Sequence, residues 1–409
     1  MRERLEGESA AWLHMDDATN PMVVSGLLEL AAVLPDEGVN ELVRRLTTFL
    51  PFSSRISEPR LHVGTPSWEP VEESPSAHVE RVSLSTSTDE DLRAFVGRTL
   101  SARLDPSRPL WRVYLIDRPS CGTTLLFRVH HAIADGYALL GLLHALSDAA
   151  VVEPPARPSL PQISRWHYAR RLIKAAERLL RLPPDQPTML QAPLSGTKRV
   201  AWSAPVPLAA VKAIGAASSA TVNDVLTAAV AGALRRYLTR RGESCDAFEL
   251  HAMVPVNLRT ANDITLTNRF GLVIVGLPVA IADPKARIGA VHRRMKRLKE
   301  SAEAKTAQLL LSSLGYLPPK LEGVVTTYFG RKSSLVLTNL MGPRERAMLS
   351  GIPIERMMFW VPEAAHLGLG ISVFSYAGEI SVCVLSDAAV LPDPEALVAD
   401  FQAELGAAA

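Results

Sequence analysis

Two proline-rich stretches near the middle of the chain divide it into two parts. The segment "VVEPPARPSLPQ" covers residues 151–162, and "RLPPDQPTMLQAPL" covers residues 181–194. Proline lacks a backbone N–H, so neither a helix interior nor a central strand continues through such segments. A chain of 409 residues, 47% of them hydrophobic, is also too long for one ordinary core. We therefore predict an N-terminal lobe over 1–150, a linker over 151–204 and a C-terminal lobe over 205–409.

Strands and helices are predicted in both lobes. Before the linker, β-rich runs cover 22–30 and 123–130, and helical periodicity covers 36–50 and 89–104. After it, the patterns predict a long helix over 221–242, a basic helix over 284–304, strands over 248–259, 270–279 and 333–340, a hairpin around Ala377-Gly378, and a last helix that begins near Asp393. Because the order lacks a strict βαβ rhythm, we predict an α+β fold with mixed sheets flanked by helices.

Composition and charge exclude several classes of protein. The 44 Lys+Arg nearly balance the 42 Asp+Glu, which is not the charge pattern of a nucleic-acid-binding protein. Three widely spaced cysteines without a CxxC pair favour a reducing, cytoplasmic location over a disulfide framework. The N-terminus has no apolar signal-peptide core, and the longest apolar run, 271–282, is too short to span a bilayer. We predict a protein that is neither secreted nor transmembrane.

The segment "HHAIADG", residues 130–136, places two histidines and an Asp-Gly pair in apolar surroundings. The β-rich run should end near His130, and Asp135-Gly136 should turn the chain into the helix that follows. An imidazole with a pKa of about 6.5 can take a proton near neutral pH, and Asp135 can brace the loop or the ring.

Three alternatives compete with this interpretation of the histidine segment. The two histidines could form a hydrogen-bonded pair in the core. A metal site built from His130, His131 and Asp135 is disfavoured, because adjacent strand residues face opposite ways and no further His or Cys cluster lies nearby. A serine hydrolase is disfavoured because the chain has no GxSxG segment.

The segment "HHAIADG" matches the HHxxxDG signature of the CoA-dependent acyltransferase superfamily, which includes chloramphenicol acetyltransferases and the condensation domains of peptide synthetases. Other segments resemble, in the same order, the bacterial wax ester synthase/diacylglycerol acyltransferase family. They are "LHMDDATNPMVVSG", "RPLWRVYLID", "VNDVLTAAVAGALRRYL", "PVNLR", "NRFG", "TNLMGPRE" and "SYAGEISVCVLSDAAVLPDPEAL". The resemblance extends over nearly the whole chain.

This resemblance implies a two-lobed fold, like that of chloramphenicol acetyltransferase and condensation domains, with a tunnel between the lobes. It implies that His131 is a general base and that no acyl-enzyme forms, while His130 is structural. Asp135 would hold the loop through an ion pair, for which we predict Arg259 as the partner; a solvated or phosphate-binding arginine is the alternative. Gly136 would permit a turn that a Cβ obstructs.

The matching motifs also offer two candidate donors for the oxyanion that forms in acyl transfer. Asn268 of "NRFG" is the stronger candidate, and Asn339 of "TNLMG" is the other. Both could instead hydrogen-bond turn backbones, and Thr221 and Asn223 are candidate helix caps. The chain departs from the family pattern at Asn257, Thr338 and Met341, which leaves the tunnel shape and the acceptor open.

The resemblance implies an acyl-CoA substrate, a long-chain alcohol or diacylglycerol acceptor, and no permanently bound cofactor. A specialised-metabolite alcohol as acceptor and a non-catalytic acyl-CoA- or lipid-binding protein are the alternatives. The segment 164–182, with six Lys/Arg against Glu177 alone, predicts a basic amphipathic helix. Such a helix suits peripheral contact with the inner membrane face or with lipid droplets, or it could be an ordinary helix between the lobes. The oligomeric state is open.

Overall fold

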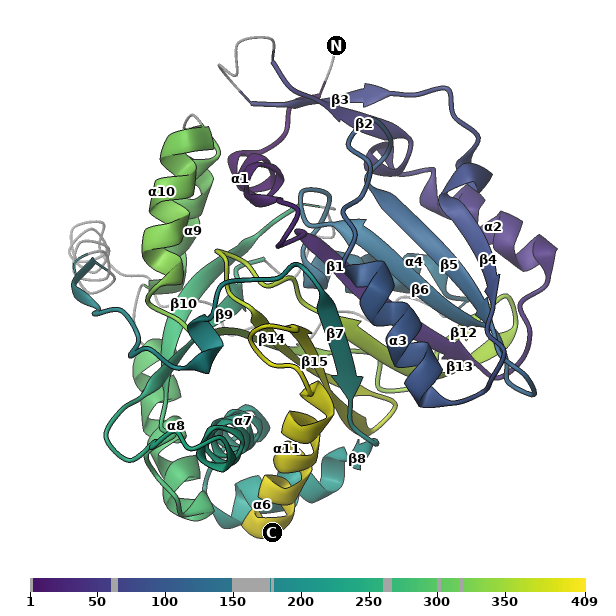
Figure 1. Cartoon of the computed structure of the whole chain (residues 1–409). Helices are drawn as coiled ribbons and strands as arrows, with labels where there is room; N and C mark the ends of the chain where they lie inside the picture. The colour runs from purple at the N-terminus through teal and green to yellow at the C-terminus, as the bar shows by residue number, and fades with distance from the viewer. Residues whose placement is uncertain are drawn as a thin grey trace.

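The structure is a computed structural model that describes residues 3–59, 65–148, 177, 180–259, 267–299, 303–316 and 319–409. Two lobes are built around separate mixed sheets (Figure 1), as the sequence predicts. The first sheet has six strands in the order β12-β13-β1-β6-β5-β4. These strands are β1 (Val23–Leu30), β4 (Val79–Ser83), β5 (Trp111–Asp117), β6 (Thr124–His130), β12 (Met348–Leu349) and β13 (Ile352–Trp360).

The second sheet has seven strands, six of them in the order β10-β9-β11-β14-β15-β7, with the short β8 paired to β15. Its strands are β7 (Lys198–Trp202), β8 (Val206–Pro207), β9 (Leu250–Asn257), β10 (Phe270–Leu277), β11 (Leu335–Met341), β14 (Leu369–Tyr376) and β15 (Glu379–Asp387). The predicted hairpin joins β14 to β15. Ala377 and Gly378 both have positive φ, as a two-residue turn of matching twist requires. A small separate sheet pairs β2 (Ser54–Ser57) with β3 (Ser67–Pro70).

The two sheets do not divide the chain at one point. Strand β13 comes from the second half of the sequence, yet it pairs antiparallel with β1 in the first sheet, with Ser25 opposite Trp360. Strand β7 lies within the predicted linker and belongs to the second sheet. The limits 1–150, 151–204 and 205–409 therefore remain a prediction, and the sheets themselves cross them.

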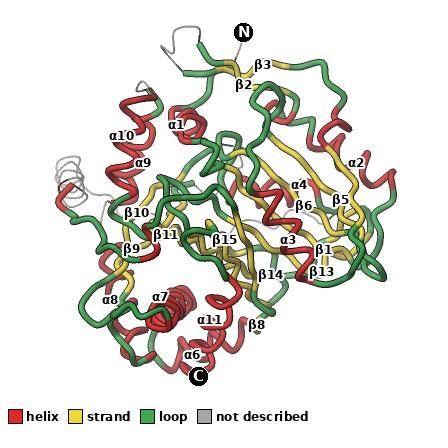
Figure 2. The backbone as a smooth tube through the Cα atoms, viewed as in Figure 1, coloured by secondary structure: helices red, strands yellow, loops and turns green. Residues whose placement is uncertain are grey.

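Helices cover both sheets. In the first lobe they are α1 (Gly7–Met15), α2 (Asp36–Leu46), α3 (Asp89–Leu100) and α4 (Gly136–Leu146), and in the second α6 (Leu208–Ala217), α7 (Val222–Arg240), α8 (Pro284–Lys299), α9 (Glu303–Leu314), α10 (Pro319–Gly330) and α11 (Pro394–Ala408). Short 3-10 turns lie at Leu50–Phe52, Pro75–His78 and Met189–Gln191. Figure 2 shows α6, α7, α8 and α11 gathered on one side of the second sheet.

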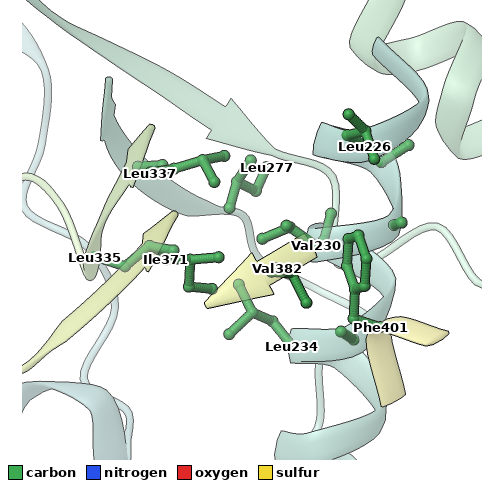
Figure 3. Packing of buried hydrophobic residues seen from close by; sticks show 14 of the residues in the cluster. Leu226, Val230, Leu234, Leu277, Leu335, Leu337, Ile371, Val382 and Phe401 are labelled. Carbon is green, nitrogen blue, oxygen red and sulfur yellow. The ribbon is translucent and has the colours of Figure 1, made fainter. Parts of the chain in front are cut away.

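The core of the second lobe forms around α7, which buries 13 of its 19 residues. In Figure 3, its Leu226, Val230 and Leu234 lie near the sheet residues Leu277 and Ile371. Burial of each such side chain contributes about 1.5–3 kcal/mol. The helix begins with a capping box formed by Thr221 and Asp224, so Asn223 is not a cap.

A separate cluster joins the two lobes. Leu92 and Val96 of α3 pack with Val200 and Trp202 of β7 and with Leu27 of β1. Because this cluster contains residues of both sheets, it fixes the first lobe against the second.

No helix in the described part of the chain is both long enough and apolar enough to cross a bilayer. The predicted basic helix over 164–182 lies largely outside the described residues. Contact with a lipid surface through that segment therefore stays a prediction.

Candidate active site

The histidine segment forms the strand-turn-helix junction that the sequence predicts. Strand β6 ends at His130, and the backbone N–H of His131 donates to the carbonyl of Met22 at 2.8 Å. Asp135 is the N-cap of α4 and accepts from the backbone N–H of Tyr137 and of Ala138. A Cβ on Gly136 would lie 2.8 Å from Leu340 Cδ1, so this glycine lets α4 begin close to β11.

Asp135 and Arg259 form the ion pair that was predicted between the two lobes. Arg259 Nη1 donates to both carboxylate oxygens, at 2.6 and 2.5 Å, and both side chains are buried. The carboxylate also accepts from the backbone N–H of Arg269 at 2.9 Å, and Arg259 Nη2 donates to the carbonyl of Thr267. Since Asp135 follows β6 and Arg259 follows β9, this pair fixes the loop of the first lobe against the second sheet.

Asn268 determines which nitrogen of His131 carries the proton. Its Nδ2 donates to the carbonyl oxygen of His131 at 2.8 Å and to Ser9 Oγ at 3.1 Å. The amide oxygen therefore faces His131 Nδ1, at 3.1 Å. An amide oxygen only accepts, so Nδ1 carries the hydrogen and Nε2 has the free lone pair. Both amide hydrogens of Asn268 are engaged, which leaves none for the predicted oxyanion role.

Aromatic side chains enclose the His131 ring. Trp12 of α1 stacks on it with ring centroids 4.0 Å apart and planes 12° from parallel, and Phe270 of β10 lies 5.6 Å away. Burial disfavours the charged imidazolium and lowers the pKa of His131 to about 4, although the Asp135 carboxylate acts in the opposite direction. The ring is therefore neutral at physiological pH, as a base must be before it takes a proton.

The other predicted residues lie around this centre. His130 is buried, its Nδ1 accepts from the backbone N–H of Ala132, and its Nε2 lies 3.8 Å from Asp16 Oδ1. Asn339 on β11 donates to Asn223 Oδ1 at 3.0 Å, so the structure connects it to the first turn of α7. Within the described residues, no group of three His, Cys, Asp or Glu side chains is placed to hold a metal ion.

Sequence reasoning missed Trp12 and Ser9 as neighbours of the histidine. Both lie on α1, and the N-terminal motif segment quoted above begins at Leu13, one residue after Trp12. A tryptophan next to a motif was the one signal in the sequence, but a buried tryptophan is more often part of the core than of a site.

An apolar cavity of about 110 Å³ lies between α4 and the first sheet. Its wall includes Gly26 of β1, Phe127 of β6, Leu143 of α4 and Met358 of β13, and Ser25 is the one polar residue among the described residues that line it. Gly136, the last residue of the histidine motif, is also part of the wall. The cavity therefore reaches the loop that carries His131.

Two family models match the chain, the wax ester synthase/diacylglycerol acyltransferase catalytic domain over residues 5–184 and the C-terminal domain of the same family over 266–408. The chain belongs to this family. Its membership assigns the chain to the acyltransferases, as the motif order had indicated.

Relatives and solved structures agree with this assignment. The Mycobacterium tuberculosis protein tgs1, named as a diacylglycerol O-acyltransferase, is 26% identical, with 91% of this chain and 88% of the relative covered. The wax ester synthase/diacylglycerol acyltransferase of Marinobacter aquaeolei superposes with a TM-score of 0.74 at 24% identity, over 99% and 98% of the two chains. A starter condensation domain of rhizomide synthetase, solved as a mutant in complex with C8-CoA and Leu-SNAC, has a TM-score of 0.63 at 12% identity, over 100% and 94%. The predicted fold is confirmed.

If His131 is the general base that the motif implies, its lowered pKa gives this acyltransferase an unusual pH dependence. The neutral ring should persist well below the ordinary histidine pKa of about 6.5, so kcat/KM should stay constant from about pH 8 to about pH 5 and fall only nearer pH 4. Because the unfolded chain already binds the proton below about pH 6.5, acid also destabilises the fold. Circular dichroism at each pH serves as the control, and an acid limb at about pH 6.5 in folded protein would contradict the prediction.

Proposed function

We propose that this protein transfers a fatty acyl group from acyl-CoA to the hydroxyl group of a long-chain alcohol or a diacylglycerol, with His131 as the general base. The observation that carries the proposal is the neutral, buried His131, whose Nε2 lone pair is set free by the Nδ1–Asn268 hydrogen bond. The family match supplies the reaction class. No bound cofactor is required, because the thioester itself is the activated acyl donor.

The proposed reaction is one direct transfer. His131 Nε2 takes the proton of the acceptor hydroxyl as its oxygen forms a bond to the thioester carbonyl carbon, and the carbonyl electron pair moves to oxygen. The oxyanion then collapses, the C=O bond returns, and the C–S bond breaks. The leaving thiolate takes the proton from Nε2, which releases CoA-SH and the ester and restores neutral His131.

The apolar cavity is proposed to hold part of the acyl chain. Its wall includes side chains on α4 and β13 and also Gly136 of the histidine motif. Its volume of about 110 Å³ is below the roughly 150 Å³ of an engineered cavity that admits benzene. A long acyl chain therefore needs α4 side chains such as Leu139 and Leu143 to move aside.

Gly26→Leu tests this assignment of the cavity. Gly26 lines the cavity, and the nearest atom to a Cβ added at this position, Met358 O, would lie 3.8 Å away, so a larger side chain can enter the void. If leucine excludes about three methylenes, each worth about 0.8 kcal/mol, kcat/KM for palmitoyl-CoA should fall roughly 50-fold. Butyryl-CoA, whose chain is short, should be used almost as well as before.

Gly141→Leu is the matched control for the cavity variant. Gly141 lies on the exposed side of α4, and a Cβ there would meet no atom within 4 Å. This variant should keep the chain-length preference of the wild type. Equal loss with palmitoyl- and butyryl-CoA in Gly26→Leu would show that the cavity does not hold the acyl chain.

The proposed function is tested by measuring CoA-thiol release from palmitoyl-CoA with hexadecanol, with dipalmitoylglycerol or with no acceptor, and by identifying the ester by mass spectrometry. We expect CoA-thiol release that depends on the acceptor. The rates with hexadecanol and with dipalmitoylglycerol then show whether the enzyme makes wax esters or triacylglycerol. Acyl-CoA binding without transfer to either acceptor would favour a specialised alcohol. Failure to bind acyl-CoA would refute the proposal.

A further inference from the structure

Trp12 has a buried hydrogen-bond donor that no described residue satisfies. The residue is 3% exposed, and its indole Nε1 has no hydrogen-bond partner among the described residues. An indole N–H can only donate, and a buried donor without a partner costs about 1–3 kcal/mol. Since Trp12 stacks on His131, this unpaired donor belongs to the residue in closest ring contact with the proposed base.

Helix α1 is held firmly in the position that places Trp12 there. A Cβ on Gly7 would overlap the backbone of Ser312, and a Cβ on Gly315 would overlap the backbone of Gly7, so α1 and the end of α9 meet at van der Waals contact. Ser312 Oγ donates to Glu8, and Ser9 Oγ accepts from Asn268. The position of the indole is therefore fixed by contacts on both sides of α1.

Three of the four amide hydrogens of the two asparagines predicted as oxyanion donors are engaged elsewhere. Asn268 gives its two amide hydrogens to the His131 carbonyl and to Ser9, and Asn339 donates to Asn223. The developing oxyanion still needs a preorganised donor close to the base, in a site from which water is excluded.

Building on the proposed function, we infer that Trp12 Nε1–H donates a hydrogen bond to the carbonyl oxygen of the acyl-CoA thioester. As the acceptor oxygen bonds to the carbonyl carbon, the C=O electron pair moves to that oxygen, and the indole hydrogen bond strengthens. No proton passes to or from Trp12. When the pair returns and the C–S bond breaks, the hydrogen bond weakens again. Trp12 is then a catalytic residue in contact with the reacting atoms.

Trp12→Phe removes the N–H and keeps an aromatic ring against His131. Loss of one oxyanion donor typically lowers kcat about 100- to 1000-fold, and we expect a decrease of that size with little change in KM for palmitoyl-CoA. The acid limb of kcat/KM should not move, because His131 stays buried beneath an aromatic ring. A purely stacking role would leave kcat near the wild-type value, and a role in setting the basicity of His131 would shift the acid limb; either result overturns the inference.

Trp360→Phe is the matched control. Trp360 is also buried, and its Nε1 also has no partner among the described residues, but it packs edge-on against Trp202 in the cluster between the lobes. The same chemical change there should leave kcat almost unchanged. A decrease as large as that in Trp12→Phe would mean that loss of any buried indole N–H impairs the enzyme, which would also overturn the inference.

A second measurement uses the wild-type protein and does not depend on the folding of a variant. In protein with ¹⁵N-labelled tryptophan, one indole N–H resonance should shift when palmitoyl-CoA is added without acceptor. It should not shift in the same way with S-hexadecyl-CoA, a thioether without the carbonyl; identical spectra would refute the inference. Absence of acyl transfer by the wild type would instead refute the proposed function, so the two failures are distinguishable.

Discussion

His131→Ala is expected to abolish most acyl transfer from palmitoyl-CoA. A positioned general base contributes about 100- to 10,000-fold to a rate, and His131 is the one ring whose Nε2 is held free by Asn268 in this site. Acyl-CoA binding should persist, because the apolar cavity is formed by other side chains. Initial rates of CoA-thiol release at saturating acceptor, together with the dissociation constant for palmitoyl-CoA, separate these two effects.

His366→Ala is the control for loss of a histidine in general. Its side chain is 54% exposed and pairs with Asp17 at 3.5 Å. The neighbouring Ala365 has the same left-handed backbone conformation, so alanine is tolerated in this loop. This variant should transfer acyl groups at the wild-type rate. If His131→Ala retained more than about a tenth of the activity, another group would have to act as the base.

Asp135→Asn is expected to lower the free energy of unfolding by about 3–5 kcal/mol, the usual result of breaking a buried ion pair by removing one partner. The amide can still cap α4 through its oxygen, so the loss combines the charge that faces Arg259 with the acceptor that Oδ2 provides for the Arg269 backbone N–H. Urea unfolding followed by tryptophan fluorescence measures the change. Retention of wild-type stability and activity would show that the pair does not hold the motif loop.

A double-variant cycle separates the ion pair from other effects of substitution. In Asp135→Asn combined with Arg259→Gln, neither buried charge remains, so the total loss should be smaller than the sum of the two single losses. The control variant is Asp246→Asn. The Asp246 side chain is 74% exposed and pairs with Arg235, so its substitution should change the free energy of unfolding little. Strict additivity in the buried pair would contradict a direct interaction between Asp135 and Arg259.

The motif loop could be predicted because its information is local. The β-rich run before His130, the Asp-Gly pair and the apolar helix pattern lie within one short segment. Each determines the conformation of residues next to it in the sequence, as Asp135 does when it caps α4. The partner Arg259 lies 124 residues away in sequence. Only the resemblance to a family indicated it, because no periodicity relates an arginine after one strand to an aspartate after another.

Helix α1 and strand β13 were missed for a physical reason. Helix α1 is buried on nearly all sides, including at Glu8 and Ser9, so it has no single apolar stripe for a sequence pattern to reveal. The hydrogen bonds of Asn268 to Ser9 and to the His131 carbonyl could not be predicted, because both residues lie far from Asn268 in the sequence. Strand β13 depends on pairing with β1, which is distant in the chain.

The position of β13 also affects how the protein is synthesised. Strand β1 ends at Leu30, and β13, one of its two partners, does not begin until Ile352. At about 5–20 residues per second, a ribosome needs roughly 15 to 60 seconds to reach that partner. During this interval β1 has an unpaired edge, which can pair with other nascent chains. Completion of the first lobe is therefore a late event in translation.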